Sequence, residues 1–365
     1  MRNLAHAFSD PRLVRKFFLL VGAIVVSFML VVTTGVLAFL RARADTGNPF
    51  PGPDTPPPNT AAPAVVPPAE QTDAPRVTGG ETAQGTEAPA ETPAPVNTTT
   101  FLIVGEHNVS PITDVIFVAC LNRDTGELNI LSIPRDTRIE LPTDTMQTMR
   151  GLGLHPPASG VLKINAINSY GGQKYGIQLL EQEIYDLIGV RVDYYADIDL
   201  AGFRKIVDDI GGVDMTIPKG GFYYSDPGQN LYIAIPAGPQ HLDGKMAEGV
   251  VRFREFPNGD IGRIETQHEF MRQFFAQLLQ KDVLIKNAVN FITTIIGYVK
   301  TDFGLTDIPG FMPVLGKLDA GGVSFYTLPG EGRYIGDVSY YIPDYSQFQD
   351  TVGKLLFTDA GGGDR

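Results

Sequence analysis

TDVIFVACLNRDTGELNILSIPRD, residues 113–136, contains two apolar runs separated by a short polar segment. The segment TGE at 125–127 is typical of a tight turn, and the aliphatic and β-branched residues on both sides are typical of strands, so the stretch predicts a hairpin. Neither run alternates between apolar and polar residues, and unbroken apolarity is typical of strands buried on both faces. We therefore expect the centre of a sheet that is covered by helices on both sides.

The segments around this hairpin alternate between strand and helix patterns. Helices are expected where apolar residues recur at helical spacing, and strands where short β-branched runs end in turn residues. The pattern predicts an α/β fold, an αβα sandwich with a central mixed sheet. The predicted strands are 101–105, 193–200, 213–218 and 323–329, and the predicted helices are 178–190, 203–212, 264–281 and 283–299.

An uncharged apolar run at 17–40 is long enough to cross a hydrocarbon core of about 30 Å as a helix. Arg41 and Arg43 follow it and no small-residue cleavage site is present, so we expect an uncleaved anchor rather than a signal peptide. Four basic residues precede the run and favour a cytoplasmic N-terminus at 1–16. The sequence thus predicts a single-pass protein of the cell membrane whose C-terminal part is extracytoplasmic; the four residues are Arg2, Arg12, Arg15 and Lys16.

Residues 41–99 are rich in Pro, Thr, Ala and Glu and contain few large apolar residues. Such a segment cannot bury enough surface to fold, and its prolines favour extended conformations, so we predict a disordered spacer. A spacer of defined reach and a tether without defined reach remain equal alternatives. The predicted domain covers 100–358, and 359–365 forms a flexible tail.

Composition excludes several functions. The net charge of −12 argues against binding to nucleic acid. The single cysteine, Cys120, cannot form an intrachain disulfide and lies among apolar residues, as expected of a buried side chain. The sequence contains no P-loop, no dinucleotide-binding glycine pattern, no HExxH and no GxSxG motif.

Basic residues gather in VRFREFPNGDIGRIETQ, residues 251–267. We predict that Arg252 and Arg254 lie two apart on a strand and point to one face, with Arg263 at the start of a helix. Guanidinium groups bind carboxylates and phosphates through two donors at once, so the stretch predicts a site for a compact anion such as a pyrophosphate. Structural ion pairs with acidic neighbours are the alternative. Further candidates at the ends of predicted elements are Asp114, Arg135, Asp136, Lys163, Asn165, Asp260 and Gln267.

These motifs resemble the LytR-CpsA-Psr (LCP) family of cell-wall proteins. They are Asp114 at the head of a strand, SIPRDT at 132–137, KIN at 163–165, IVDDIGGVDMTIP at 206–218, HLDG at 241–244 and the arginine-rich stretch at 251–267. The resemblance implies an extracytoplasmic αβα fold with an apolar tunnel for a polyprenyl chain. It also implies a phosphotransferase that moves an anionic glycopolymer, such as teichoic acid or capsule, from a polyprenyl pyrophosphate carrier to peptidoglycan, with Mg²⁺ or Mn²⁺ assisting.

Carried over residue by residue, the resemblance implies a metal ligand at Asp114 and a phosphate clamp of five cations. Gln267 would orient Arg263 or a phosphate oxygen, and Asp136 would either fix Arg135 or act as base for the incoming hydroxyl. Two positions depart from the family pattern. Glu106, beside His107, stands where many members have a metal-binding aspartate and is the second candidate metal ligand; Ile112 stands where many have an arginine. The five cations are Arg135, Lys163, Arg252, Arg254 and Arg263.

Three functions follow as hypotheses: a glycopolymer transferase, a protein that binds polyprenyl-linked wall precursors without transferring them, and a structural or regulatory anchor. Metal-dependent turnover distinguishes the first from the second, and binding of a prenyl pyrophosphate distinguishes both from the third. Near the C-terminus, Tyr340, Tyr341 and Tyr345 can either complete the core or bind glycan.

Overall fold

A computed structural model describes residues 97–107, 110–229, 231–256, 260–280, 294, 297–304 and 306–358 of the chain. Apart from residues 304, 306 and 307, these belong to one compact unit. The predicted N-terminus, membrane helix and tail, the spacer up to residue 96, and most of the predicted helix at 283–299 lie outside the described residues. Within the described residues, no helix is both long enough and apolar enough to cross a membrane.

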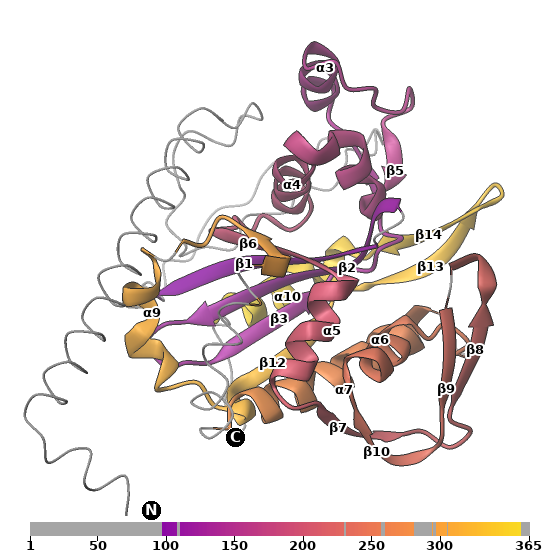
Figure 1. Ribbon diagram of the computed structural model, residues 1–365. Helices are drawn as coiled ribbons and strands as arrows, with labels where there is room; N and C mark the ends of the chain where they lie inside the picture. The colour runs from indigo at the N-terminus through magenta and orange to yellow at the C-terminus, as the bar shows by residue number, and fades with distance from the viewer. Residues whose placement is uncertain are drawn as a thin grey trace, which may run out of the picture. The chain divides into compact units, whose positions relative to one another are not determined.

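The central sheet has six strands in the order β11-β6-β1-β2-β3-β12 (Figure 1). β2 and β3 pair antiparallel, with Cys120 opposite Asn129, which confirms the predicted hairpin. β1 is antiparallel to β2 and parallel to β6, and β12 is parallel to β3, so the sheet is mixed as expected. The strands span Thr98–His107 (β1), Ser110–Asn122 (β2), Leu128–Ser132 (β3), Tyr194–Asp199 (β6), Val299–Thr301 (β11) and Val323–Thr327 (β12).

Helices cover both faces of this sheet. On one face, α4 (Ile167–Ile188) and α10 (Phe348–Leu355) pack on a core that includes Leu102 and Val118. On the other face, α7 (Asp260–Leu278) contributes Met271 and Phe275 to a cluster with Phe117. Alternate residues of β2 thus enter opposite cores, which is why the strand is apolar without interruption. Cys120 is buried, and burial raises the pKa of its thiol to about 12.

Beside the sheet, two further helices, α7 and two small sheets form a second core. Asp199 caps the N-terminus of α5 (Leu200–Asp209), and its side chain accepts a hydrogen bond from Gly202 N. Asp243 caps α6 (Gly244–Arg252) in the same way and accepts a hydrogen bond from Met246 N. The predicted strand at 213–218 is β7 (Val213–Ile217), which pairs with β10 (Gly238–Leu242) outside the central sheet. The second small sheet joins β8 (Phe222–Asp226) to β9 (Leu231–Ile235).

The loop after β3 is held by the C-terminal hairpin. Tyr341 N donates to Asp136 O at 2.8 Å, and Tyr341 bridges to Thr137. This hairpin consists of β13 (Gly330–Ile335) and β14 (Val338–Pro343). The remaining elements are β4 (Arg138–Glu140), α3 (Thr143–Gly151), β5 (Val161–Lys163), η1 (Ile164–Ala166), η2 (Pro227–Gln229), α9 (Ile308–Leu315), η3 (Ala320–Gly322) and η4 (Tyr345–Gln347).

One predicted element is wrong. Residues 251 and 252 end helix α6 instead of forming a strand, and Phe253 and Arg254 follow in extended or irregular backbone. The helix forms because Asp243 caps it and because Ala247 and Val250 face the second core. Arg252 and Arg254 therefore do not share one face of a strand.

Candidate functional site

Asp114 and Arg135 lie where the carboxyl ends of the parallel strands meet. Four strands run in the same direction: β1, β3, β6 and β12. Asp114 belongs to the antiparallel β2 and lies at their carboxyl edge, because the next residue, Val115, is paired with Gly105 near the end of β1. Arg135 follows the end of β3 by three residues. Ligands of open α/β sheets usually bind at this edge.

An ion-paired cluster is centred on Asp114. Arg135 Nη1 donates to Asp114 Oδ1 at 2.7 Å, and Arg254 Nη2 lies 3.7 Å from the same oxygen. The side chains of Arg135, Asp114 and Arg254 are 21%, 27% and 32% exposed, respectively. Two guanidinium groups thus share one carboxylate, and both remain accessible to a ligand from solvent.

A second ion pair extends this cluster. Lys163 Nζ lies 3.2 Å from Asp136 Oδ1, and Arg135 Nε lies 4.0 Å from that oxygen. The Lys163 ammonium also lies 5.9 Å from the ring centre of Tyr340. Backbone bonds fix these positions, since Asn165 N donates to Arg135 O at 3.2 Å. Asp136 is thus placed as a partner that holds both cations.

The whole set, here called the edge cluster, consists of Asp114, Arg135, Asp136, Lys163 and Arg254. It joins three cations to two carboxylates from four segments that are distant in the sequence. Its excess of positive charge, in a partly buried position, favours an anion.

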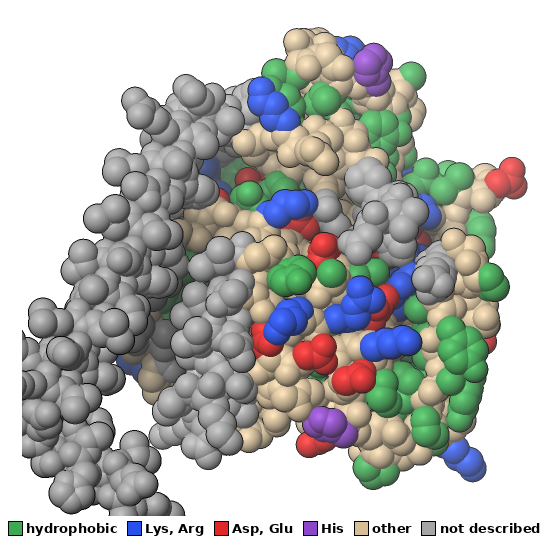
Figure 2. Space-filling view, viewed as in Figure 1, with side chains coloured by type: hydrophobic (Ala, Val, Ile, Leu, Met, Phe, Trp, Pro, Cys, Tyr) green, Lys and Arg blue, Asp and Glu red, His purple; other side chains and the backbone are tan. Residues whose placement is uncertain are grey.

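Arg252 lies in a different environment. It is 8% exposed, and its Nη1 donates to Glu248 Oε1 at 2.6 Å, one turn earlier on α6. The other oxygen of Glu248 accepts from Arg204 Nη1 at 2.8 Å. In the view of Figure 2, basic and acidic side chains lie side by side over α5 and α6. The role of Arg252 in a phosphate clamp stays a prediction, and the contact observed is a buried ion pair.

Arg263 and Gln267 lie one turn apart on α7 and are 5% and 7% exposed. Gln267 Nε2 donates to Val251 O at 3.0 Å, which attaches α7 to the last turn of α6. The predicted role of Gln267 in orienting Arg263 or a phosphate oxygen stays a prediction. The side chains of Asp260 and Glu106 lie outside the described residues.

Asp114 is the metal ligand that the sequence predicts. Mg²⁺ is usually held by one or two carboxylates together with substrate phosphates, and both arginine contacts of Asp114 are made by Oδ1. In the part of the chain that the structure describes, no three His, Cys, Asp or Glu side chains come together as a metal site. The role of Asp114 as a metal ligand stays a prediction.

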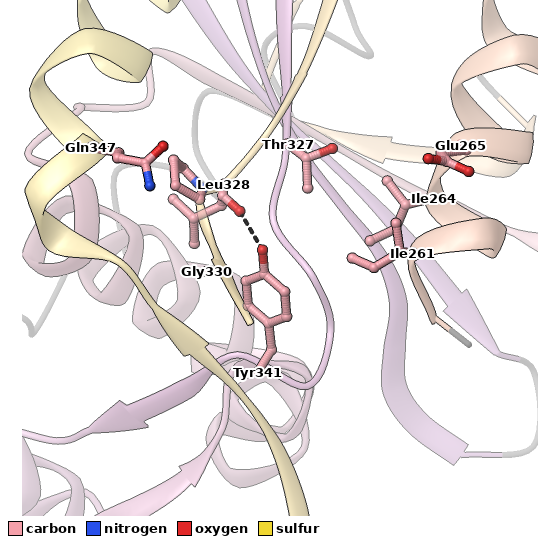
Figure 3. A pocket seen from close by; sticks show the side chains of 9 residues that line it. Ile261, Ile264, Glu265, Thr327, Leu328, Gly330, Tyr341 and Gln347 are labelled. Atoms are coloured by element: carbon pink, nitrogen blue, oxygen red, sulfur yellow. Dashed lines mark hydrogen bonds between the residues drawn. The ribbon is translucent and has the colours of Figure 1, made fainter. Parts of the chain in front are cut away.

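A pocket of about 340 Å³ opens at the same edge of the sheet, between the start of α7 and the end of β12 (Figure 3). The structure places Tyr341 in its wall, where the hydroxyl donates to Leu328 O at 2.7 Å. Sequence reasoning missed this pocket, although the end of the predicted strand 323–329 and the flagged tyrosines pointed to the region. The lining residues are Ile261, Ile264, Glu265, Thr327, Leu328, Pro329, Gly330, Tyr341 and Gln347.

The fold and the edge cluster define an α/β protein with three cations and two carboxylates at the carboxyl edge of its sheet. The sequence profile of the LytR-CpsA-Psr family matches residues 81–355, and the chain belongs to this family. The predicted resemblance is thereby confirmed.

Curated relatives and solved structures agree with this family assignment. The chain is 38% identical over 167 residues to the probable cell wall biosynthesis protein LcpB of Corynebacterium glutamicum, covering 46% of this chain and 33% of the relative. It is 24% identical over 247 residues to the polyisoprenyl-teichoic acid–peptidoglycan teichoic acid transferase TagV of Bacillus subtilis, covering 67% and 59%. The chain thus spans between a third and three fifths of the length of these relatives.

The crystal structure of B. subtilis TagV aligns with a TM-score of 0.57 at 22% identity, covering 71% of this chain and 97% of that one. The structure of TagT bound to LIIa-WTA aligns with a TM-score of 0.55 at 20% identity, covering 72% and 90%. These likenesses show that the chain has the fold of the LCP transferases.

Proposed function

We propose that the chain is an extracytoplasmic phosphotransferase that attaches an anionic glycopolymer, such as teichoic acid or capsule, from a polyprenyl pyrophosphate carrier to peptidoglycan. The observation that carries this proposal is the edge cluster, in which three cations surround two carboxylates at the carboxyl edge of the sheet. Membership of the LCP family supports it. The relative TagV is a teichoic acid transferase by name, which is the same type of reaction.

The edge cluster suits a pyrophosphate because its cations come from different directions. Arg135 and Arg254 approach Asp114 from separate segments, and Lys163 approaches from a third. A bound pyrophosphate would exchange part of these internal ion pairs for bonds to phosphate oxygens, which guanidinium groups contact with two donors. Asp114 and Asp136 keep the cations in place in the absence of ligand.

Phosphoryl transfer requires positioned positive charge rather than a covalent protein nucleophile. In the proposed reaction, the acceptor hydroxyl oxygen forms a bond with the phosphorus that carries the glycopolymer. The bridging P–O bond breaks, prenyl monophosphate leaves with its electron pair, and the hydroxyl proton passes to solvent. Arg135, Lys163 and Arg254 would stabilise the negative charge that develops on the phosphate oxygens.

Asp114 would hold Mg²⁺ or Mn²⁺, and the bound ion would supply positive charge that polarises the phosphoryl group. Asp136 would fix Arg135 and Lys163, because its Oδ1 lies within 4.0 Å of both cations. The further members of the predicted clamp would act from the neighbouring helices: Arg263 from α7, and Arg252 indirectly, through the ion pair with Glu248 that stabilises α6.

The proposed location is the cell membrane, with the N-terminus in the cytoplasm, the helix at 17–40 as a single anchor, and the domain outside. Support comes from the uncharged run and its basic N-terminal flank. Membrane attachment would bring the edge cluster to a lipid-linked substrate.

A second candidate is a protein that binds polyprenyl-linked wall precursors without transferring them. The observation that favours it is the ion pairing of Asp114 Oδ1 with two arginines, together with a glutamate at position 106 in place of the aspartate found in many LCP proteins. The third hypothesis, an anchor without a ligand, requires that prenyl pyrophosphate does not bind.

A transfer assay tests the proposal. Full-length protein in detergent receives a short-chain prenyl pyrophosphoryl sugar, a soluble peptidoglycan glycan and Mg²⁺ or Mn²⁺. We expect a phosphodiester-linked product and prenyl monophosphate in equal amounts, and loss of both with Arg135→Ala and with Asp114→Asn. Binding of the donor without turnover, also with an authentic polymer donor, would support the precursor-binding protein and contradict the transferase.

A further inference from the structure

We infer that the pocket between α7 and β12 is the subsite for the acceptor, and that it binds a neutral, hydroxyl-rich sugar next to the phosphate site. This inference rests on the proposed transferase function and assigns one of its two substrates to a place in the fold. Four observations support it: the position of the pocket, its lining, its size and its attachment to the edge cluster.

The pocket and the edge cluster are neighbours along one edge of the sheet. Thr327 ends β12 opposite Ser132, which ends β3, and Leu328 N donates to Ser132 O at 2.9 Å. Three residues after Ser132 the chain reaches Arg135 of the edge cluster. An acceptor in the pocket would therefore lie beside a pyrophosphate that is bound by Arg135.

Tyr341 links the two places directly. Its backbone N–H donates to Asp136 O at 2.8 Å, while its side chain lines the pocket and donates to Leu328 O at 2.7 Å. The residue is 7% exposed, so this wall of the pocket is part of the packed interior. Figure 3 shows the hydroxyl of Tyr341 directed at Leu328, with Thr327 between this wall and the α7 residues.

The lining differs in chemistry from the edge cluster. No Lys or Arg lies among the nine described residues that line the pocket, so these residues supply no cationic side chain to a phosphate. Glu265, Thr327 and Gln347 supply carboxylate, hydroxyl and amide groups, and Ile261, Ile264 and Pro329 supply apolar surface. A sugar ring presents hydroxyl groups around its rim and C–H groups on its faces, which this mixture matches.

The size agrees with such a ligand. Ligand pockets usually measure about 300–1,000 Å³, and this one measures about 340 Å³. The volume suits a sugar residue or two and leaves the rest of a glycan chain in solvent. The charge difference between the two places then separates the substrates: the pyrophosphate binds at the edge cluster and the hydroxyl enters from the pocket.

Two variants test the pocket. Ile261→Trp places a large side chain in the opening from a position that is 40% exposed, so that no core contact is lost. Thr327→Val removes one hydroxyl and keeps the shape of the side chain. Ala276→Trp is the matched control, because Ala276 is exposed on the same helix and does not line the pocket.

Two measurements on the full-length protein separate the subsite from the reaction. The first is the calorimetric affinity for a soluble peptidoglycan glycan, which requires no donor. The second is the acceptor KM in the transfer assay, with donor hydrolysis in the absence of acceptor as reference.

We expect Ile261→Trp to weaken glycan binding and to raise the acceptor KM at least about tenfold. Its kcat should not change, because the substitution weakens acceptor binding equally in the ground state and in the transition state. Thr327→Val should raise the acceptor KM about fivefold, as expected for one lost hydrogen bond. Donor hydrolysis should stay within about twofold of wild type in all three variants. An acceptor affinity that is unchanged in Ile261→Trp would overturn the inference. Glycan binding without any transfer by wild type would contradict the proposed function and leave the pocket assigned.

Discussion

Arg252 provides a test of how the structure divides the arginines between stability and function. The side chain of Arg252 is 9% exposed, and its guanidinium donates at 2.6 Å to Glu248, whose side chain is also 9% exposed. Arg252→Ala would leave Glu248 with Arg204 as its remaining partner, at 2.8 Å. The replacement therefore removes one of the two cations that balance the charge of the buried Glu248 carboxylate.

The size of the effect follows from this geometry. Removing one partner of a buried ion pair costs about 3–5 kcal/mol when the remaining charge has no other partner. Because Glu248 keeps Arg204, which is half-exposed, we expect about 2–3 kcal/mol. For a domain of this size, each kcal/mol shifts Tm by about 2–4 °C, which gives a decrease of about 4–12 °C.

The assay is thermal unfolding of full-length protein, followed by circular dichroism, together with affinity for a prenyl pyrophosphate at a temperature where both proteins are folded. Arg254→Ala is the matched control, because Arg254 is 32% exposed and its carboxylate contact is 3.7 Å long. The control should change Tm by less than about 2 °C and weaken pyrophosphate binding. If Arg252→Ala kept its Tm and lost pyrophosphate binding, the assignment of Arg252 to a structural ion pair would be refuted.

Three further changes have defined outcomes. Burial raises the pKa of Glu183 from 4.5 to about 8, so the folded state retains a proton that the unfolded state loses. The free energy of unfolding should therefore fall as pH rises from about 4.5 to 8. Chemical denaturation of Glu183→Gln should show a smaller decrease over this range. Burial lowers the pKa of His268 from 6.5 to about 4, so stability should fall as pH decreases over that window, and in His268→Phe the decrease should be smaller. Gln267→Leu removes the bond to Val251 O and should lower the free energy of unfolding by about 1 kcal/mol, whereas unchanged stability would show that this bond does not hold α7.

Much of the fold could be predicted because its strands and helices have strong local patterns. The hairpin of β2 and β3 was predicted from two apolar runs and a turn, and the structure confirms it. The strand β12 was predicted from VSFYTLP, but its parallel pairing with β3 joins residues nearly 200 positions apart and has no local signal. The strand β7 was also predicted, while its place outside the central sheet was not.

The arginine-rich stretch shows why alternation alone can mislead. VRFRE alternates between apolar and basic residues as a half-buried strand does, yet the first two residues end a helix that is capped eight residues earlier by Asp243. The decisive information was the cap and the apolar face of the preceding turns. The partner of Arg252 also comes from that helix, because Glu248 lies four residues before it.

The candidate site was predictable in its residue types and not in its arrangement. Asp114, Arg135 and Lys163 were all singled out at the ends of elements, and the structure brings Asp114 and Arg135 into contact and places Lys163 beside Asp136. The pocket beside them depends on Tyr341, whose backbone bond to Asp136 crosses more than 200 residues of sequence. A contact of this kind is visible only once the chain is folded.

The most direct test of the edge cluster is the equilibrium binding of a short prenyl pyrophosphate to the full-length protein, measured by calorimetry with and without Mg²⁺. Prenyl monophosphate serves as the ligand control, and Arg135→Ala as the protein control. We expect the pyrophosphate to bind at least about tenfold more tightly than the monophosphate, and Arg135→Ala to weaken its binding by about 2 kcal/mol or more while Tm stays within about 3 °C. Equal binding of both ligands, or an affinity that Arg135→Ala leaves unchanged, would show that the edge cluster is not the pyrophosphate site.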